Sequence, residues 1–243
     1  MSRWVYGVHP VEETLVGRRT RPDLVLVRKG GSGKTIGRLE ALARDQGVKV
    51  RFTDQEEFER ISDGGNHQGV AARMPDYQYA DYHDWLESLK EPMPDVLILD
   101  GIQDPHNLGA IIRTADCFGI GGVVIGKDRS AQVTETAIRT SAGAAEHMPV
   151  VRIVNLARTL KDLKDIGYWI VGTDVEADTT LYDVKLNFPA VFIMGSEEKG
   201  MRPLTGKSCD YLVKLPNLGQ VHSLNVSVAS GVLLGENYRQ KKK

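Results

Sequence analysis

Five short apolar runs recur along residues 95–194, and segments with helical patterns separate them. The first run is Val96–Leu99, which Asp100 closes, and the later ones lie at residues 122–125, 148–153, 168–172 and 190–194. Short runs that are apolar throughout are typical of strands buried on both faces. Strands that alternate with helices favour a mostly parallel sheet covered on both sides. The pattern therefore predicts an α/β domain over residues 95–243.

A smaller α/β unit is predicted over residues 1–74. Strand-like patterns lie at residues 24–27, 48–52 and 69–73, and helical spacing at residues 35–46 and 55–61. Gly47 is expected to end the first of these helices, and Asp54 can cap the second. Residues 75–94 contain three prolines with acidic and aromatic residues, so we interpret them as a linker with one short helix at 83–89.

Composition excludes several classes of protein. Hydrophobic residues make up 41% and charged residues 26% of the 243 residues, as in ordinary globular proteins. No apolar run approaches the roughly 20 residues of a membrane span, and the N-terminus lacks the apolar core of a signal peptide. Cys117 and Cys209 are far apart, and the six histidines have no ligand spacing. We therefore expect a cytoplasmic protein without a structural metal or disulfide.

Charge is distributed unevenly. Residues 1–51 carry 11 Lys/Arg against 5 Asp/Glu, a net of +6, whereas residues 52–100 carry 3 against 12, a net of −9. A basic first segment indicates a local surface for a polyanion such as a nucleic acid. The alternative is that these cations are simply solvated at helix ends.

The segment Gly30–Thr35 resembles a phosphate-binding Walker A loop. That loop needs a glycine five positions before Gly33, and Arg28 stands there instead. Because the loop wraps phosphates with backbone amides, the missing glycine argues against a nucleotide triphosphatase. A basic loop that contacts RNA phosphates through Lys29 and Lys34 is the better interpretation.

Three segments, at residues 100–115, 188–201 and 215–232, each lead from an apolar strand or strand end into a helix or an acidic loop. In the first, Asn107 stands where a helix cap is expected, and Arg113 follows among Ile, Ala and Leu. Burial of an unpaired charge is costly, so Arg113 is expected to have an anionic partner. In the third, Ser223 and Asn225 precede a helix of small residues. Plain alternatives are helix capping and an ordinary strand-to-helix turn.

Together, and in this order, the three segments resemble the three motifs of the SpoU/TrmH (SPOUT) family of RNA 2′-O-methyltransferases. Residues 6–11 and 66–71 also resemble the signatures of the substrate-binding domain in the branch of that family that methylates a guanosine ribose in 23S (large-subunit) ribosomal RNA. The chain departs from the family at Glu198, where glycine is usual. This departure leaves Glu197 as the expected functional acid.

The resemblance implies a fold, a cofactor and partners. It implies an L30e/L7Ae-like domain ahead of a SPOUT domain with a C-terminal trefoil knot, a homodimer, and S-adenosylmethionine as cofactor. General rules of chain connection argue against knots, so the knot is an expectation from the resemblance alone.

The resemblance also implies roles for individual residues. It assigns catalysis to Arg113, with Glu197, Ser223 and Asn225 orienting both the ribose and Arg113. Asn107 would support these residues. It assigns cofactor binding to Gly195, Leu215 and Leu224, mainly through backbone contacts. It assigns RNA binding to His9 and His67, and the basic loop adds Lys29 and Lys34 to the expected RNA ligands. Arg113 acts either as a general base or as a phosphate ligand, and the high basicity of arginine favours the second role.

Two alternatives remain open. One is the same chemistry on transfer RNA or on another ribosomal nucleotide, which the N-terminal domain disfavours. The other is a non-catalytic RNA-binding, ribosome-associated protein, which the presence of all five assigned catalytic residues disfavours.

Overall fold

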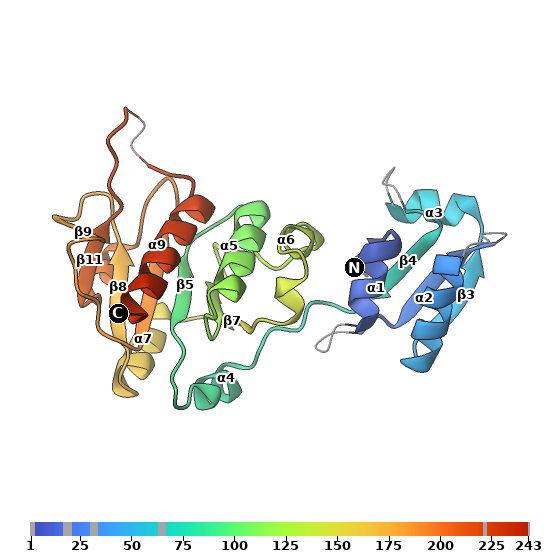
Figure 1. Cartoon of the computed structure of the whole chain (residues 1–243), viewed down its shortest axis with the longest axis horizontal. Helices are drawn as coiled ribbons and strands as arrows, with labels where there is room; N and C mark the ends of the chain where they lie inside the picture. Colours follow the sequence, from blue (N-terminus) through green and yellow to red (C-terminus); the bar gives the residue numbers. More distant parts are fainter. Residues whose placement is uncertain (1–2, 17–20, 30–33, 63–66, 221–222, 243) are drawn as a thin grey trace. The chain divides into compact units, whose positions relative to one another are not determined.

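The computed structural model describes residues 3–16, 21–29, 34–62, 67–220 and 223–242. The chain divides into two compact units, Met1–Gln78 and Tyr79–Lys243 (Figure 1). Gly30–Gly33 of the Walker-like segment, Asn66 of the second N-terminal signature and the side chain of Lys34 lie outside the described residues.

The first unit is a four-stranded sheet in the order β1-β4-β2-β3, with helices on both faces. Strand β2 is parallel to β3, and β4 is antiparallel to both β1 and β2. Alternate residues of β2 enter two cores, one under α1 and α2 and the other under α3. The elements are β1 (Arg3–Tyr6), α1 (Val8–Val16), β2 (Leu24–Arg28), α2 (Lys34–Asp45), β3 (Lys49–Thr53), α3 (Gln55–Ser62) and β4 (Val70–Met74).

The second unit contains a seven-stranded parallel sheet in the order β7-β6-β5-β10-β8-β11-β9. This confirms the predicted α/β class. The strands are β5 (Val96–Asp100), β6 (Val123–Gly126), β7 (Val150–Ile153), β8 (Trp169–Thr173), β9 (Thr179–Thr180), β10 (Ala190–Gly195) and β11 (Tyr211–Lys214). Strand order and register do not define how the chain threads, so the knot stays a prediction.

Helices cover both faces of this sheet. Helix α5 (Pro105–Cys117) packs against α6 (Glu135–Thr140), the 3-10 turn η1 (Ala144–Glu146) and α9 (Val226–Lys241), and α5 and α9 lie side by side in Figure 1. The opposite face carries α4 (Tyr82–Ser88), α7 (Leu156–Asp165) and α8 (Pro203–Lys207). Each of four helices begins in the chain after the carboxyl end of a parallel strand: α5 after β5, α7 after β7, α8 after β10 and α9 after β11.

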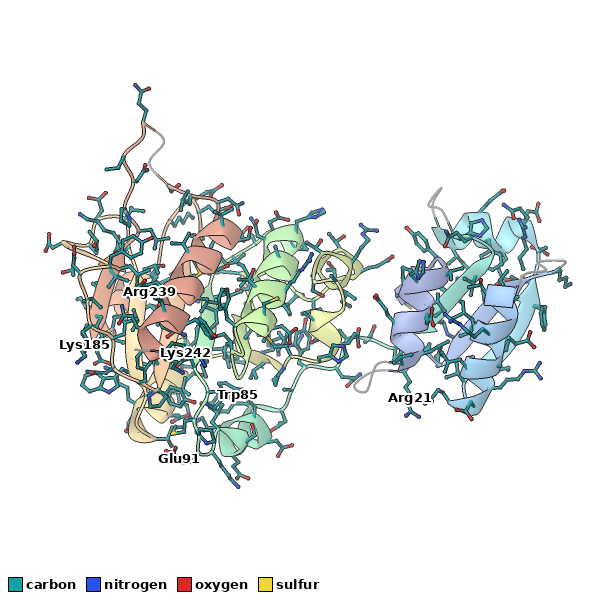
Figure 2. All side chains as sticks on the ribbon, in the orientation of Figure 1. Arg21, Trp85, Glu91, Lys185, Arg239 and Lys242 are labelled. Carbon is teal, nitrogen blue, oxygen red and sulfur yellow. The ribbon has the colours of Figure 1, made fainter. Side chains whose placement is uncertain are left out.

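The segment that the sequence placed in a linker packs in part on the second unit. Ala80 forms a β-bridge with Val151, and Trp85 of α4, labelled in Figure 2, is 3% exposed within the core. The indole Nε1 of Trp85 donates a hydrogen bond of 3.2 Å to the carbonyl of Gly121. A Cβ on Gly122 would lie 2.5 Å from that Nε1, so the contact requires glycine there.

Candidate active site

Three segments that are far apart in sequence meet beyond the carboxyl ends of β5 and β10. These strands pair with Gly195 opposite Asp100, which brings the loop after β10 next to the start of α5. Glu197 comes from that loop, Asn107 from the first turn of α5, and Asn225 from the N-cap of α9. The three predicted motifs therefore converge at one edge of the sheet.

Glu197 is the centre of a hydrogen-bond cluster. Its Oε1 accepts bonds from Asn107 Nδ2 at 3.2 Å, Asn225 Nδ2 at 3.1 Å and the backbone N–H of Val226 at 3.2 Å. Asn225 Nδ2 also donates to Asn107 Oδ1 at 3.0 Å. These bonds hold the carboxylate through Oε1, and within the described part of the chain Oε2 has no hydrogen-bond partner. The free oxygen can accept a bond from a bound hydroxyl.

Asn225 also caps helix α9. Its Oδ1 accepts hydrogen bonds from the backbone N–H groups of Ser227 at 2.9 Å and Val228 at 3.4 Å, which have no partner inside the helix. Because Oδ1 faces the helix, Nδ2 is the atom that faces Glu197. One end of the side chain thus performs the expected capping role, and the opposite end bonds to Glu197.

The loop that carries Glu197 closes on itself. Ser196 and Gly200 exchange two backbone hydrogen bonds, of 3.1 and 2.9 Å. A Cβ on Gly195 would lie 2.2 Å from backbone atoms of both Gly200 and Met201, so only glycine fits there. Glu198, which replaces the family's usual glycine, is exposed and forms no hydrogen bond with described residues.

A pocket of about 450 Å³ lies beside this cluster. Its lining includes all three residues predicted to bind cofactor, Gly195, Leu215 and Leu224, together with Glu197 and Ser223. The volume lies within the range of small-molecule sites. Its charged lining consists of one lysine, Lys199, and four carboxylates, those of Asp174, Glu176, Glu197 and Glu198. The pocket therefore favours a ligand that carries positive charge.

One expectation about α5 is wrong, and a second finds no support among the described residues. The cap of α5 is Asp104, whose side chain accepts from the N–H of His106 at 2.9 Å, and Pro105 follows it. Asn107 therefore lies inside the first turn and is buried. Arg113 is exposed and forms no ion pair with any described residue, so the expected anionic partner is absent from this part of the chain.

Arg113 also lies away from the Glu197 cluster within one chain. The helix advances about 9 Å over the six residues from Asn107 to Arg113 and turns through about 600°, so the two side chains leave it on different sides. Ser223 lines the pocket but forms no hydrogen bond to the cluster. The structure thus brings together Asn107, Glu197 and Asn225 of the five predicted catalytic residues.

The two N-terminal signatures meet in the first unit. The N–H of Val8 donates to Gln68 Oε1 at 2.9 Å, which holds the start of α1 against the turn before β4. His67 stacks on Phe58 with ring centroids 4.7 Å apart, and its Nδ1 accepts from the N–H of Gly69 at 3.1 Å. His9 is exposed near the start of α1.

The remaining predicted RNA ligands follow β2. Lys29 is exposed directly after this strand, and Lys34 is the first residue of α2. Among the residues that the structure describes, no helix is long and apolar enough to cross a membrane. Within those same residues no group of three or more His, Cys, Asp or Glu side chains could hold a metal ion.

One polar network was not predicted. The Asp100 carboxylate is fully buried and accepts bonds from Arg202 Nε at 2.6 Å, the N–H of Arg202 at 3.0 Å and Thr205 Oγ1 at 2.8 Å. The sequence signal was an aspartate that ends an otherwise apolar strand, a pattern too common to be specific. A buried carboxylate needs such partners, and its three donors fix the start of α8 against β5.

The fold and the pocket first define a class: a two-unit α/β protein with a small-molecule pocket at the carboxyl edge of a parallel sheet. Comparison with known families then narrows it. Residues 94–235 match the SpoU rRNA Methylase family, and residues 4–80 match the family described as RNA 2′-O ribose methyltransferase substrate binding. The chain belongs to the SpoU rRNA methylase family.

Individual relatives agree with this assignment. The 23S rRNA (guanosine-2′-O-)-methyltransferase RlmB of Escherichia coli K12 is 43% identical over 244 residues, which cover 99% of this chain and 100% of the relative. A solved RNA 2′-O ribose methyltransferase is 25% identical with a TM-score of 0.76, covering 99% of this chain and 89% of the other. The SpoU methyltransferase AviRb of Streptomyces viridochromogenes, solved with AdoMet (S-adenosylmethionine), shares the fold at 22% identity and a TM-score of 0.82, covering 100% and 91%.

Proposed function

We propose that this chain transfers a methyl group from S-adenosylmethionine to the ribose 2′-hydroxyl of a guanosine in 23S ribosomal RNA, as an RlmB-type enzyme. The observation that carries the proposal is the meeting of Asn107, Glu197 and Asn225, one from each family motif, beside a pocket of about 450 Å³. The full-length similarity to RlmB supports the choice of substrate. Because this substrate is ribosomal RNA, we expect the protein to act in the cytoplasm.

The chemistry of the pocket fits the cofactor. When bound, S-adenosylmethionine supplies a methyl group activated by the positive charge of its sulfonium sulfur. The four carboxylates around the pocket, against one lysine, complement a cationic ligand. Gly195, Leu215 and Leu224 would hold it, with Leu215 and Leu224 supplying apolar surface and Gly195 allowing a close backbone approach.

The chain's own residues position the acceptor. A protonated 2′-hydroxyl is a poor nucleophile, so its orientation and the polarity around it carry most of the catalysis. Glu197 Oε2 can accept the hydroxyl proton in a hydrogen bond while Asn107 and Asn225 hold Oε1. Ser223, in the pocket wall, can orient the ribose. A guanidinium offers hydrogen-bond donors and no acceptor, so we assign Arg113 to a phosphate of the substrate rather than to the role of general base.

We further propose that the active form is a homodimer. Val228 is 53% exposed and Tyr238 52% exposed on α9, which packs on α5, the helix that carries Arg113. A second copy that covers α5 and α9 would bury these apolar side chains and could present its own Arg113 to the neighbouring pocket. Light scattering of the active enzyme should give twice the mass of one chain, and an active monomer would overturn this part of the proposal.

A direct assay separates the proposed function from its alternatives. Purified protein is incubated with S-adenosylmethionine labelled in the methyl group and with either 23S ribosomal RNA fragments or transfer RNA, and the nucleosides are identified by mass spectrometry. We expect 2′-O-methylguanosine from 23S RNA only. Label in transfer RNA would support the same chemistry on another substrate. RNA binding without label in any RNA would support the non-catalytic alternative.

A further inference from the structure

A second pocket lies at the same edge of the sheet, beyond β5, β6 and β7. Its volume is about 380 Å³, and three cationic side chains line it, those of Lys127, Arg129 and Arg202, with Asp128 as the single acid. Its charge is opposite to that of the pocket beside Glu197. The two pockets are neighbours along the chain, because Met201 lines the acidic one and Arg202 the basic one.

The guanidinium of Arg202 is fixed in position on one side and exposed on the other. Its Nε donates to the buried carboxylate of Asp100 at 2.6 Å, yet its side chain is 61% exposed. A guanidinium has five N–H donors, and this bond uses the one on Nε. The two terminal nitrogens have no hydrogen-bond partner in the described part of the chain, so they can bind two oxygens of one phosphate, a geometry that arginine favours.

The loop that carries Lys127 and Arg129 is fixed from within. Gln132 Nε2 donates to the carbonyls of Gly126 at 3.2 Å and Ser130 at 3.0 Å, and the N–H of Lys127 bonds to β7 at Ile153 with a distance of 2.7 Å. Arg129 has a φ of +55°, a left-handed conformation that is uncommon for residues other than glycine. Such conformations persist where surrounding bonds enforce them, and they concentrate at functional sites.

Arg202 is paired with Asp100, but the other two cations of this pocket, Lys127 and Arg129, have no ion-pair partner among the described residues. Leu156, the first residue of α7, also lines the pocket, so the partially positive end of that helix adds to the same field. Anions commonly bind beyond the carboxyl ends of parallel strands, where helix N-termini gather.

We propose that this basic pocket binds a phosphodiester of the RNA substrate. The phosphodiester would lie close to the nucleotide whose ribose enters the acidic pocket beside Glu197. The inference rests on the proposed function for the identity of the ligand as RNA. Phosphate contacts fix the register of a nucleic acid without reading its sequence. Lys127, Arg129 and Arg202 would thus hold the backbone while the N-terminal unit contributes selection.

The test removes two charges without disturbing the loop. In the variant Lys127→Gln/Arg129→Asn, asparagine tolerates the left-handed conformation at position 129. A matched control is Lys161→Gln/Lys185→Gln, because both lysines are exposed in the same unit and neither lines either pocket. Both proteins are compared with wild type for binding of a 23S RNA fragment at several salt concentrations, for KM and kcat, and for affinity toward S-adenosylmethionine.

The proposal predicts a specific loss in the pocket variant. Its affinity for RNA at 0.15 M salt should fall about fivefold or more, and the slope of log affinity against log salt should shrink by about 1.4 for two lost contacts with a single strand. KM for RNA should rise accordingly while kcat and cofactor affinity stay near wild type. The control should keep the wild-type slope.

The outcomes distinguish this inference from the proposed function. A pocket variant with the RNA affinity, salt slope and KM of wild type overturns the phosphate site even if the enzyme methylates RNA. Wild-type protein that methylates no RNA overturns the proposed function, whereas the binding comparison still decides the pocket. If the double variant loses cofactor affinity through misfolding, the single variant Lys127→Gln, at an exposed position, gives the same comparison with one expected contact.

Discussion

Asn225 performs two tasks that two substitutions can separate. Its Oδ1 caps α9, and its Nδ2 holds Glu197 and Asn107. Serine at this position keeps an oxygen for the cap but removes the amide donor, whereas alanine removes both. Comparing Asn225→Ser with Asn225→Ala therefore separates the stability of the helix from the geometry of the site.

The expected magnitudes follow from the bonds. Loss of the N-cap costs about 1 kcal/mol, and loss of the two amide bonds at this partly exposed site costs about another 1 kcal/mol in total. The free energy of unfolding should thus fall by about 1 kcal/mol in Asn225→Ser and about 2 kcal/mol in Asn225→Ala. With a urea dependence of about 2 kcal/mol per molar, the midpoints should fall by about 0.5 M and about 1 M.

Two measurements check this account. Urea unfolding is followed by tryptophan fluorescence, since the buried Trp85 reports on the second unit. Both variants should also lose methyl transfer by a similar factor, up to about a hundredfold, because each removes the same Nδ2 bonds, one to Glu197 and one to Asn107. Equal midpoints for the two variants would refute the cap. A wild-type rate for Asn225→Ser would refute the view that Asn225 positions Glu197.

Three further predictions concern other sites. Arg113→Ala should abolish methyl transfer with unchanged cofactor affinity, because the side chain is exposed; activity within about tenfold of wild type, a barrier change of about 1.4 kcal/mol, would remove its assigned role. Gly195→Ala should eliminate cofactor binding in calorimetry, since its Cβ would lie 2.2 Å from backbone atoms, whereas Gly206→Ala, with nothing within 4 Å, should bind normally. Burial, reinforced by the charge of a neighbouring aspartate, raises the pKa of Cys209 to about 11, so at pH 8 it stays a protonated thiol. Iodoacetamide should therefore label the exposed Cys117 first in mass spectra of the native protein, and equal labelling would contradict the burial.

Local patterns in the sequence predicted the architecture of the second unit well. The run Val96–Leu99 lies in β5, as predicted. The alternation of such runs with helices correctly predicted a parallel sheet. Strand β1 and helix α1 were missed because Arg3–Tyr6 is short and α1 has a proline near its start. The Asp104–Pro105 pair was an available signal for the start of α5, and it outweighs an asparagine two residues further on.

The site was predictable only in part. The motifs identified Glu197 and Asn225, but their mutual bonds join residues that are far apart in sequence, which no local pattern can define. The pair of Asp100 and Arg202 spans 102 positions and was missed for the same reason. The exposure of Arg113 was mispredicted because apolar sequence neighbours on a helix do not share one face with it.

The central claim is the methylation of one guanosine ribose in 23S ribosomal RNA, and a map of 2′-O-methyl positions tests it most directly. RNA from a strain that lacks this gene is compared with RNA from the same strain carrying the wild-type gene or the Arg113→Ala variant. The account predicts that a single 23S guanosine loses its 2′-O-methyl group without the gene, regains it with the wild-type gene, and stays unmethylated with the variant. An unchanged 23S map, or a methyl group lost from transfer RNA instead, would contradict it.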